Sequence, residues 1–396
     1  MARILTDEIK IKELLRRGVE KIYPSQEFLE QRLKSGEELK IYLGIDPTGP
    51  DLHLGHSVQL LTLKRFEDLG HKTILVVGDF TARIGDPSGR DQKRVPLTEK
   101  QVKENEKKFK EQAGKVLNFK RTEIRHNSEW LSKFKFEDVL ELASRKTVQQ
   151  LLDRDMFRKR IEKGDPIGGN EFMYPLMQGF DSVALEVDGE IGATDQTFNM
   201  LVGRDLEKVY LGKEKFVFIT RLLINPKTGE KMMSKTAGDY ISLRAPAPEM
   251  YAGVMALPDE VVFEMFELCT EVSFEKIGYL KSGSILAAKH ELAHEITKIY
   301  HEEKEAFRAR EEFVRVFSNK EEPTEMPSFS GTGTMLIDFM IKSGLAKSRS
   351  EAKQLVEQGA VRINKEIIKI GDQRNYELRE GDVIQVGPRK FAKITK

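Results

Sequence analysis

The chain has little cysteine, little tryptophan and no long apolar run. Cys269 is the one cysteine among 396 residues, which excludes an intrachain disulfide and a thiolate zinc cluster and fits a reducing compartment. No apolar stretch approaches the roughly 20 residues that cross a bilayer. The first ten residues, MARILTDEIK, contain no apolar signal core. We therefore expect a soluble, cytoplasmic protein without a membrane partner.

An excess of charge of one sign is also lacking, because 65 Lys and Arg balance 64 Asp and Glu to a net charge of +1. The distribution is uneven: residues 331–396 hold 13 Lys or Arg against 8 Asp or Glu, so the remainder carries −4. Residues 319–333, NKEEPTEMPSFSGTG, have the composition of a linker. We predict a large domain over 1–245, a helical domain over 246–318, this linker, and a small basic domain over 334–396.

Short apolar runs alternate with a helical pattern in the large domain. Residues 39–45 predict a buried strand, residues 54–69 a helix and residues 73–78 a second strand. Further strands are expected near 186–191 and 215–219. A strand, a helix and a strand of these lengths form a βαβ unit, so we predict an α/β, Rossmann-like fold with a parallel sheet. Ligands in such sheets bind at the carboxyl ends of the strands.

Two histidines open the predicted helix in the sequence His53-Leu54-Gly55-His56. Imidazoles at a helix N-terminus join free backbone N–H groups and the positive end of the helix dipole, an arrangement that suits a triphosphate. Gly55 would let a ligand approach the backbone. The alternative is a turn with two surface histidines.

A second candidate segment is EKMMSKT at residues 230–236, which follows the turn NPKTG. Lys235, flanked by the hydroxyls of Ser234 and Thr236, could close over a departing pyrophosphate. Taken alone, the segment is typical of an ordinary lysine-containing loop.

Together, HLGH and the later MSKT resemble the HIGH and KMSKS motifs of class I aminoacyl-tRNA synthetases. Within that class, the whole chain resembles the tyrosyl-tRNA synthetase family, through the stretches YLGIDPT, IGDPSGR, YPLMQGFD and ATDQ and the basic C-terminal domain. One departure stands out: Met232 occupies the position of the first lysine of KMSKS, and Lys231 precedes it. Lys235 transfers to the motif, whereas the role of Lys231 is open.

Three polar residues share one face of a predicted helix over 172–185, because Tyr174, Gln178 and Asp181 fall at i, i+4 and i+7. They either face solvent or line a pocket. The resemblance implies that Asp181 and Tyr42 bind the phenol of a tyrosine substrate. In the pocket interpretation, Tyr174 and Gln178 would bind the ammonium of the substrate. A phenylalanine in this pocket would leave the phenol-binding groups unpaired at low dielectric, which is costly.

The resemblance assigns the remaining candidates to tyrosine and ATP, the latter entering with Mg²⁺ and no structural metal being expected. It implies that Thr48 and His53 approach the γ-phosphate and that His56 lies near the ribose and α-phosphate. Asp195 would bind the ribose hydroxyls. The other candidates share a place near the two substrates: Asp86 at the ammonium, Gln196 at the reacting carboxylate, Arg90 and Arg94 at pyrophosphate, and Asp46, Gly55, Ser234 and Thr236 at ATP. The implied reaction makes tyrosyl-adenylate and then charges tRNA(Tyr), so the function expected is that of a tyrosine–tRNA ligase.

The C-terminal domain is predicted as two short helices, 335–343 and 350–358, followed by strands near 360–363 and 383–386. Four basic residues in its helical part suit phosphate contacts: Lys342, Lys347, Arg349 and Lys353. The domain resembles a small RNA-binding fold of a ribosomal protein, which is also found on pseudouridine synthases. The resemblance implies a tRNA partner and a homodimer. An rRNA-modifying enzyme and a tryptophanyl-tRNA synthetase are the alternatives.

His290-Glu291-Leu292-Ala293-His294 matches the HExxH pattern of zinc peptidases, and His301 follows. On a helix these histidines fall opposite the apolar stripe of Leu292 and Ile296. We therefore expect them on a solvated or RNA-facing surface and expect no metal. The role of the basic stretch 100–125, either a solvated helix or an acceptor-stem contact, is open.

Overall fold

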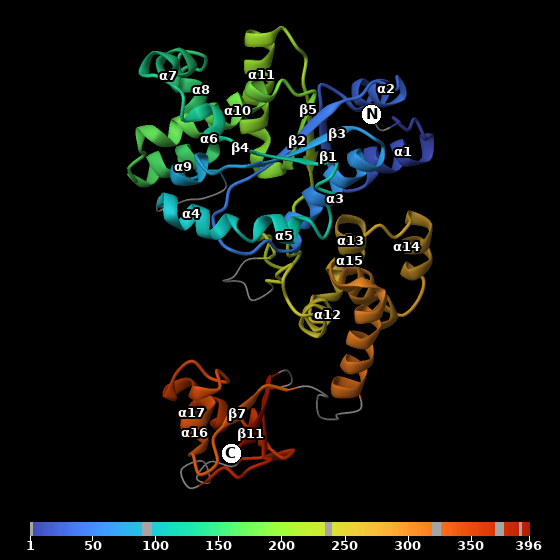
Figure 1. The fold of residues 1–396 in the computed structure, drawn as a ribbon, viewed down its shortest axis with the longest axis vertical. Helices are drawn as coiled ribbons and strands as arrows, with labels where there is room; N and C mark the ends of the chain where they lie inside the picture. Colours follow the sequence, from blue (N-terminus) through green and yellow to red (C-terminus); the bar gives the residue numbers. More distant parts are fainter. Residues whose placement is uncertain (1–2, 89–96, 234–239, 319–325, 369–375, 388–389) are drawn as a thin grey trace. The chain divides into compact units, whose positions relative to one another are not determined.

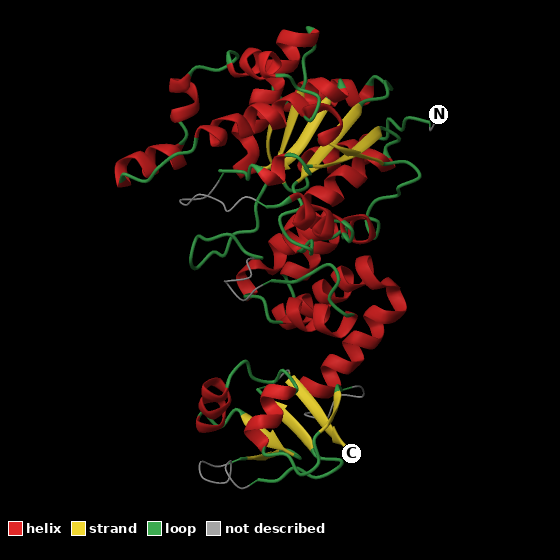
Figure 2. Ribbon diagram, turned by 60° about the vertical axis from the view of Figure 1, so that its left-hand side comes forward, coloured by secondary structure: helices red, strands yellow, loops and turns green. Residues whose placement is uncertain are grey.

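The computed structural model describes residues 3–88, 97–233, 240–318, 326–368, 376–387 and 390–396. Its chain divides into two compact units, Met1–Phe307 and Arg308–Lys396. Figures 1 and 2 show each unit with a β-sheet and associated helices. The first unit also contains the helical part of the chain between residue 247 and Phe307.

The first unit is built on a six-stranded sheet in the order β1-β6-β5-β2-β3-β4, in which only β1 runs antiparallel, to β6. Its strands are β1 (Val19–Tyr23), β2 (Lys40–Ile45), β3 (Lys72–Val77), β4 (Glu123–His126), β5 (Gly189–Ala193) and β6 (Phe216–Thr220). Its α-helices before the sheet is complete are α1 (Glu8–Arg16), α2 (Gln26–Lys34), α3 (Leu54–Asp68), α4 (Glu99–Glu106), α5 (Phe109–Ala113), α6 (Ser128–Leu131), α7 (Phe136–Ala143), α8 (Val148–Leu152), α9 (Asp155–Lys163), α10 (Gly169–Leu185) and α11 (Thr197–Leu211).

The predicted βαβ unit is confirmed. Strand β2 leads into α3, which leads into β3, and β2 and β3 pair in parallel from Lys40↔Lys72 to Ile45↔Val77. Helix α3 packs on both strands, and it ends where Gly70 takes the left-handed φ of 96° expected after a helix. The strand predicted at 186–191 begins later, at Gly189, because Glu186 caps α10.

Helices α12 (Ala247–Met255), α13 (Val262–Cys269), α14 (Phe274–Lys281) and α15 (Ile285–Phe313) follow the sheet. The predicted change to a helical pattern near residue 246 is therefore confirmed. Helix α15 is interrupted at Glu302, which has a non-helical φ of 68°. Four short helical turns complete the chain: η1 (Thr81–Arg83), η2 (Thr194–Gln196), η3 (Asp259–Val261) and η4 (Val314–Ser318).

The second unit holds a five-stranded sheet in the order β7-β11-β10-β8-β9 and two helices. The elements are β7 (Ser328–Ser330), α16 (Leu336–Lys342), α17 (Arg349–Glu357), β8 (Val361–Ile363), β9 (Glu366–Ile367), β10 (Val383–Val386) and β11 (Lys390–Thr395). The two predicted helices and two predicted strands are present. The linker predicted at 319–333 is too long, however, because Ser328–Ser330 pairs with β11 and Phe329 packs against Phe339. A polar composition does not exclude an edge strand anchored by one aromatic ring.

Candidate active site

A buried polar cluster lies where β2 ends, at the carboxyl edge of the sheet. Asp46 directly follows β2, and its Oδ1 accepts a hydrogen bond of 2.7 Å from the Thr81 hydroxyl. Its Oδ2 accepts one of 2.9 Å from the Tyr174 hydroxyl. Burial raises the pKa of Tyr174 well above its ordinary value, and the carboxylate of Asp46 raises it further. Tyr174 is therefore held as a neutral donor to Asp46.

The polar face of α10 points inward, so the pocket interpretation is favoured over the solvent-facing one. Asp181 is 3% exposed, and its Oδ1 accepts a 2.8 Å hydrogen bond from the Trp130 indole N–H. Asn127 donates to its Oδ2 at 3.4 Å. Burial raises the pKa of Asp181 well above its ordinary value, against the effect of these two donors. A further hydroxyl donor would therefore stabilise the ionised form of this buried carboxyl group.

Tyr42 joins the same buried cluster from β2. Its hydroxyl lies 3.2 Å from Ser182 Oγ, and it reaches the backbone carbonyl of Gln178 at 3.5 Å. Burial raises the pKa of Tyr42 well above its ordinary value, and the charges of Glu190 and Asp181 add to the shift. Tyr42 and Asp181 are therefore close enough to influence each other.

A second chain of hydrogen bonds runs through amide side chains. Gln178 Nε2 donates to Glu190 Oε1 at 3.0 Å, and Gln178 Oε1 accepts from Asn199 Nδ2 at 3.0 Å. Asn199 Nδ2 also reaches Gln196 Oε1 at 3.0 Å, and Gln196 Nε2 donates to Asp86 Oδ2 at 2.7 Å. The candidates Gln178, Gln196 and Asp86 are thus brought together from three separate segments of the chain.

The two imidazoles cap the N-terminus of α3. His53 is the N-cap, and its Nδ1 accepts from the Gly55 N–H at 3.1 Å. The His53 N–H donates to His56 Nδ1 at 3.2 Å, and the ring centroids lie 3.9 Å apart. Burial lowers the pKa of His56 well below its ordinary value, and the nearby His53 lowers it further. Because each Nδ1 accepts from backbone, a neutral ring carries its proton on Nε2 and can donate it to an anion.

Gly55 has a more local role than the one predicted. A Cβ at this position would lie 2.9 Å from two atoms of the His53 ring, closer than real Cβ contacts permit. The glycine therefore keeps the capping position of His53 open. Thr48, by contrast, is exposed in the turn before α3, with its backbone N–H bonded to Asp46 O at 2.8 Å.

Asp195, in η2, lies beside Lys231, with 2.6 Å between Asp195 Oδ2 and Lys231 Nζ. Met232, at the position of the missing motif lysine, is buried. Five of the predicted site residues lie outside the described part of the chain: Arg90, Arg94, Ser234, Lys235 and Thr236.

Several residues of the cluster were missed from the sequence. Trp130 and Asn127 hold Asp181, Glu190 holds Gln178, and Arg154 donates to Ser88 Oγ at 2.7 Å. Burial lowers the pKa of Arg154 to about 10, while Asp86 opposes the shift. Only Glu190 had a signal in the sequence, a carboxylate in the middle of an apolar strand.

The histidines of the HExxH pattern do not form a solvated surface. His294 is 7% exposed and lies 2.8 Å from Glu303 Oε1, because α15 is kinked at Glu302 and the Phe307 ring beyond the kink packs on the imidazole, with 5.0 Å between the ring centroids. His290 Nδ1 lies 2.8 Å from the Tyr251 hydroxyl, and His301 Nε2 lies 2.7 Å from the Ala245 carbonyl. Each imidazole thus has its own protein partner. Across the described residues, no group of three His, Cys, Asp or Glu side chains could hold a metal ion.

The four basic residues predicted to bind RNA are exposed on the second unit. Arg349 pairs with Asp338, and Lys342 Nζ donates to the Ser330 carbonyl at 2.9 Å. Lys347 precedes α17, and Lys353 lies within it. In the stretch 100–125, Lys103 pairs with Glu99 and Arg121 donates to the Glu67 carbonyl, so these two cations are partly engaged within the protein.

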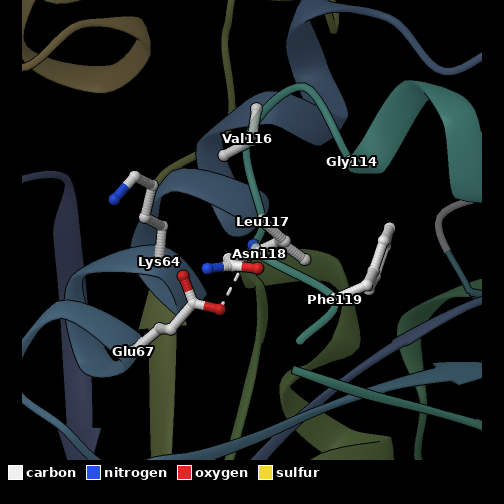
Figure 3. A pocket seen from close by; sticks show the side chains of 7 residues that line it. All are labelled: Lys64, Glu67, Gly114, Val116, Leu117, Asn118 and Phe119. Carbon is white, nitrogen blue, oxygen red and sulfur yellow. Dashed lines mark hydrogen bonds between the residues drawn. The ribbon is translucent and has the colours of Figure 1, made fainter. Parts of the chain in front are cut away.

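A surface pocket lies at the other end of α3 from the imidazoles (Figure 3). It is lined by Lys64, Glu67, Gly114, Val116, Leu117, Asn118 and Phe119. Glu67 Oε1 accepts from the Asn118 N–H at 3.2 Å and from the Thr122 hydroxyl at 2.7 Å. The Glu67 carboxylate is thus engaged in hydrogen bonds within the protein. Among the described helices, none has the length and apolar character needed to span a membrane.

Comparison with known sequences gives two family matches. The model of class I tRNA synthetases of the tryptophan and tyrosine type matches residues 34–318, and the S4 domain model matches residues 336–384. The chain is 45% identical to a tyrosine–tRNA ligase of Thermotoga maritima over 399 residues, covering 99% of this chain and 98% of the relative. It is 43% identical to the enzyme of the same name from Moorella thermoacetica, covering 96% and 94%.

Solved structures share the fold. A truncated mitochondrial tyrosyl-tRNA synthetase of Aspergillus nidulans matches with a TM-score of 0.66 at 23% identity, covering 78% of this chain and 94% of that chain. A tyrosyl-tRNA synthetase of Archaeoglobus fulgidus, solved with L-tyrosine, matches with a TM-score of 0.60 at 21% identity, covering 77% and 100%.

Proposed function

Because the chain belongs to the class I tyrosyl-tRNA synthetases, we propose that it activates tyrosine with ATP and transfers it to tRNA(Tyr). It is an aminoacyl-tRNA ligase. The first step makes tyrosyl-adenylate and releases pyrophosphate, and the second esterifies the 3′-terminal ribose of the tRNA.

One observation supports the assignment to tyrosine above all others: a buried carboxyl, Asp181, and a buried phenol, Tyr42, lie in one polar cluster. Asp181 and Tyr42 would receive the substrate hydroxyl, with Asp181 accepting its proton. Tyr174, Gln178 and Asp86 would bind the ammonium group at the opposite end. A tryptophan or phenylalanine side chain would leave the first pair without a polar partner, which is costly in a buried site.

The nucleotide would lie at the N-terminus of α3. The Nε2–H groups of His53 and His56 would donate to phosphate oxygens, aided by the helix dipole. Asp195 would bind the ribose, Thr48 the γ-phosphate, and Gln196 would lie near the reacting carboxylate. The other predicted nucleotide contacts remain proposals from the sequence: Asp46, Gly55, Arg90, Arg94, Ser234, Lys235 and Thr236. Mg²⁺ would enter with ATP as part of the substrate.

The chemistry needs no covalent nucleophile from the protein. The tyrosine carboxylate attacks the α-phosphorus, the bond to the β-phosphate oxygen breaks, and pyrophosphate leaves. The protein positions the two reactants and stabilises charge that develops on the phosphates. Neutral imidazole donors suit this task because they provide hydrogen bonds without having to lose or gain a proton.

The second unit would bind tRNA through its exposed basic residues, in keeping with its match to the S4 domain. A homodimer is proposed from the apolar side chains that α7 and α8 present to solvent. Phe136 is 77% exposed, Val148 60% and Leu140 57%, an unusual set of large apolar groups for a free surface. Sedimentation analysis of Phe136→Glu against the unaltered protein tests this, since a dimer on this face would dissociate and a dimer elsewhere would not. The cytoplasmic location remains a prediction from the sequence.

Exchange of labelled pyrophosphate into ATP tests the proposed function when tyrosine, tryptophan and phenylalanine are offered separately. Tyrosine alone should support rapid exchange, and tRNA(Tyr) should then be charged. Exchange that is faster with tryptophan, or absent with all three amino acids, would refute the proposal.

A further inference from the structure

Beside the proposed tyrosine site lies a buried lysine that the proposed reaction does not use. Lys215 precedes β6 and is fully buried. Its Nζ lies 2.5 Å from Glu190 Oε2 and 2.7 Å from Ser182 Oγ. It also lies 5.8 Å from the centroid of the Tyr42 ring. Burying a lysine costs free energy unless the ammonium is paired and hydrogen-bonded, so the presence of Lys215 at this place needs an explanation.

Space for this contact is provided by Gly203 of α11. A Cβ at Gly203 would lie 2.7 Å from Lys215 Nζ and 2.9 Å from Ser182 Oγ. Any larger residue would push the ammonium away from the serine. The approach of Lys215 to Ser182 is thus built into the packing of α10, α11 and the start of β6.

The chemistry of these groups gives their hydrogen bonds a direction. An ammonium group only donates, so Ser182 Oγ accepts from Lys215. The serine keeps one hydrogen to donate, and Tyr42 Oη, at 3.2 Å, is the acceptor that its described contacts offer. Tyr42 Oη then accepts from Ser182 and must direct its own hydrogen elsewhere. That hydrogen reaches the backbone carbonyl of Gln178 at 3.5 Å, a contact long enough for a nearer acceptor beside Asp181 to replace it.

We propose that Lys215 and Ser182 are positioning residues that orient the Tyr42 hydroxyl as a donor toward the phenol oxygen of the substrate. The substrate phenol would then accept from Tyr42 and donate to Asp181, which a hydroxyl does well and a bare phenyl ring cannot do. Aligned chains of this kind strengthen each member. The inference rests on the proposed function and deepens it by naming what sets the polarity of the hydroxyl site.

Glu190 links this hydrogen-bond chain of Lys215, Ser182 and Tyr42 to the group proposed to bind the other end of the substrate. Its Oε2 neutralises Lys215, while its Oε1 accepts from Gln178, a residue proposed to bind the substrate ammonium. The carboxylate therefore fixes two pocket side chains at once. Its removal should disturb the binding of any amino acid, whereas removal of the Ser182 hydroxyl should affect only substrates that carry a phenol.

The test compares tyrosine with phenylalanine in Ser182→Ala and Lys215→Met. We expect kcat/KM for tyrosine in pyrophosphate exchange to fall about 10-fold or more in each. We expect the inhibition constant of phenylalanine as a competitor to stay within about 2-fold of the unaltered value. Lys213→Met is the matched control, because Lys213 lies two residues away and pairs with Asp188 at 3.0 Å. It should behave as the unaltered protein.

Unchanged tyrosine kinetics in Ser182→Ala, or equal losses for tyrosine and phenylalanine, would overturn the inference. Lys215→Met leaves Glu190 buried without its cation and can fail to fold, in which case Ser182→Ala alone decides. An unaltered protein without tyrosine-dependent exchange would remove the proposed function and this inference with it. Active unaltered protein with non-selective losses would remove the inference only.

Discussion

The Lys231 ammonium lies 2.6 Å from the Asp195 carboxylate, measured from Nζ to Oδ2. Lys231 directly precedes Met232, which stands where the family motif has its first lysine and whose own side chain is buried. A cation thus reaches the proposed ribose site from one position earlier in the chain. ATP that binds Asp195 through its ribose would have to share or replace this ion pair, which would release Lys231 next to the nucleotide.

We predict that Lys231→Ala lowers kcat/KM for ATP about 10-fold and leaves the KM for tyrosine unchanged. The pair is partly exposed and contributes about 1 kcal/mol or less to folding, so thermal unfolding should barely change. Steady-state pyrophosphate exchange at varied ATP measures the effect. Lys227→Ala serves as control, because Lys227 lies on the same turn and pairs with Glu260 instead. Equal behaviour of the two variants would show that Lys231 has no role toward ATP.

The cap and donor roles of His53 can be separated by two substitutions. Asparagine can still cap a helix N-terminus, whereas alanine cannot and costs about 1 kcal/mol of stability. We predict that His53→Asn keeps the unfolding temperature but lowers kcat for adenylate formation at least 10-fold, with tyrosine affinity unchanged. His53→Ala should lose both stability and kcat. Rapid-mixing measurement of adenylate formation distinguishes them, and a normal kcat in His53→Asn would mean that the imidazole is only a cap.

A buried carboxyl on α11 should make stability depend on pH. Both carboxylate oxygens of Glu207 are buried without a hydrogen-bond partner among the described residues. Burial raises its pKa to about 7, against the attraction of Lys215 and Lys213. Because the folded state holds this proton more tightly than the unfolded state does, the contribution is stabilising at low pH. It is lost as pH rises from about 4.5 to 7.

Glu207→Gln should therefore be more stable than the unaltered protein at pH 8, by about 1–3 kcal/mol. It should also lack the fall in stability between pH 4.5 and 7. Urea unfolding across this range measures the free energy of unfolding. Glu20→Gln, a change of an exposed glutamate in β1, should leave the curve unaltered. If the free energy of unfolding of Glu207→Gln depended on pH in the same way as that of the unaltered protein, Glu207 would be ionised in the folded protein.

Sequence patterns predicted the elements whose periodicity is local. The runs at β2, α3 and β3 are long, apolar and bounded by turn residues, so their type and order could be predicted. Strands β1 and β4 were missed because charged residues interrupt both: Val19–Tyr23 contains Glu20 and Lys21, and Glu123–His126 has Ile124 as its one apolar residue. Their pairing depends on neighbours far away in sequence, such as Val19 with Thr220.

In the candidate site, too, residues that share one element could be predicted, whereas contacts between distant segments could not. Tyr174, Gln178 and Asp181 could be predicted as one face because they share a helix. The partners that hold them, such as Trp130 and Lys215, come from distant segments, and a lysine before a strand is normally exposed. His294 shows the converse error, because a kink at Glu302 buries a histidine that the helical pattern alone placed on the surface.

Substitutions in the second unit should weaken tRNA binding and leave tyrosine activation unchanged. We predict that the double variant Arg349→Ala, Lys353→Ala raises the KM for tRNA about 10-fold and lowers the salt dependence of binding by about one unit per lost phosphate contact. Pyrophosphate exchange should be unchanged. Lys396→Ala removes an exposed cation elsewhere on this unit and should have no effect. Equal salt dependence in the double variant and the unaltered protein would exclude this face from RNA contact.

The most direct test of the tyrosine pocket is the ratio of kcat/KM for tyrosine to that for phenylalanine, measured in the unaltered protein and in Asp181→Ala. If Asp181 accepts the substrate phenol, the ratio falls at least 100-fold, because loss of this hydrogen bond in a buried site costs about 3 kcal/mol. The fall should come from a lower kcat/KM for tyrosine, while the KM for ATP and the thermal stability stay unchanged. A ratio that is the same in both proteins would contradict the account.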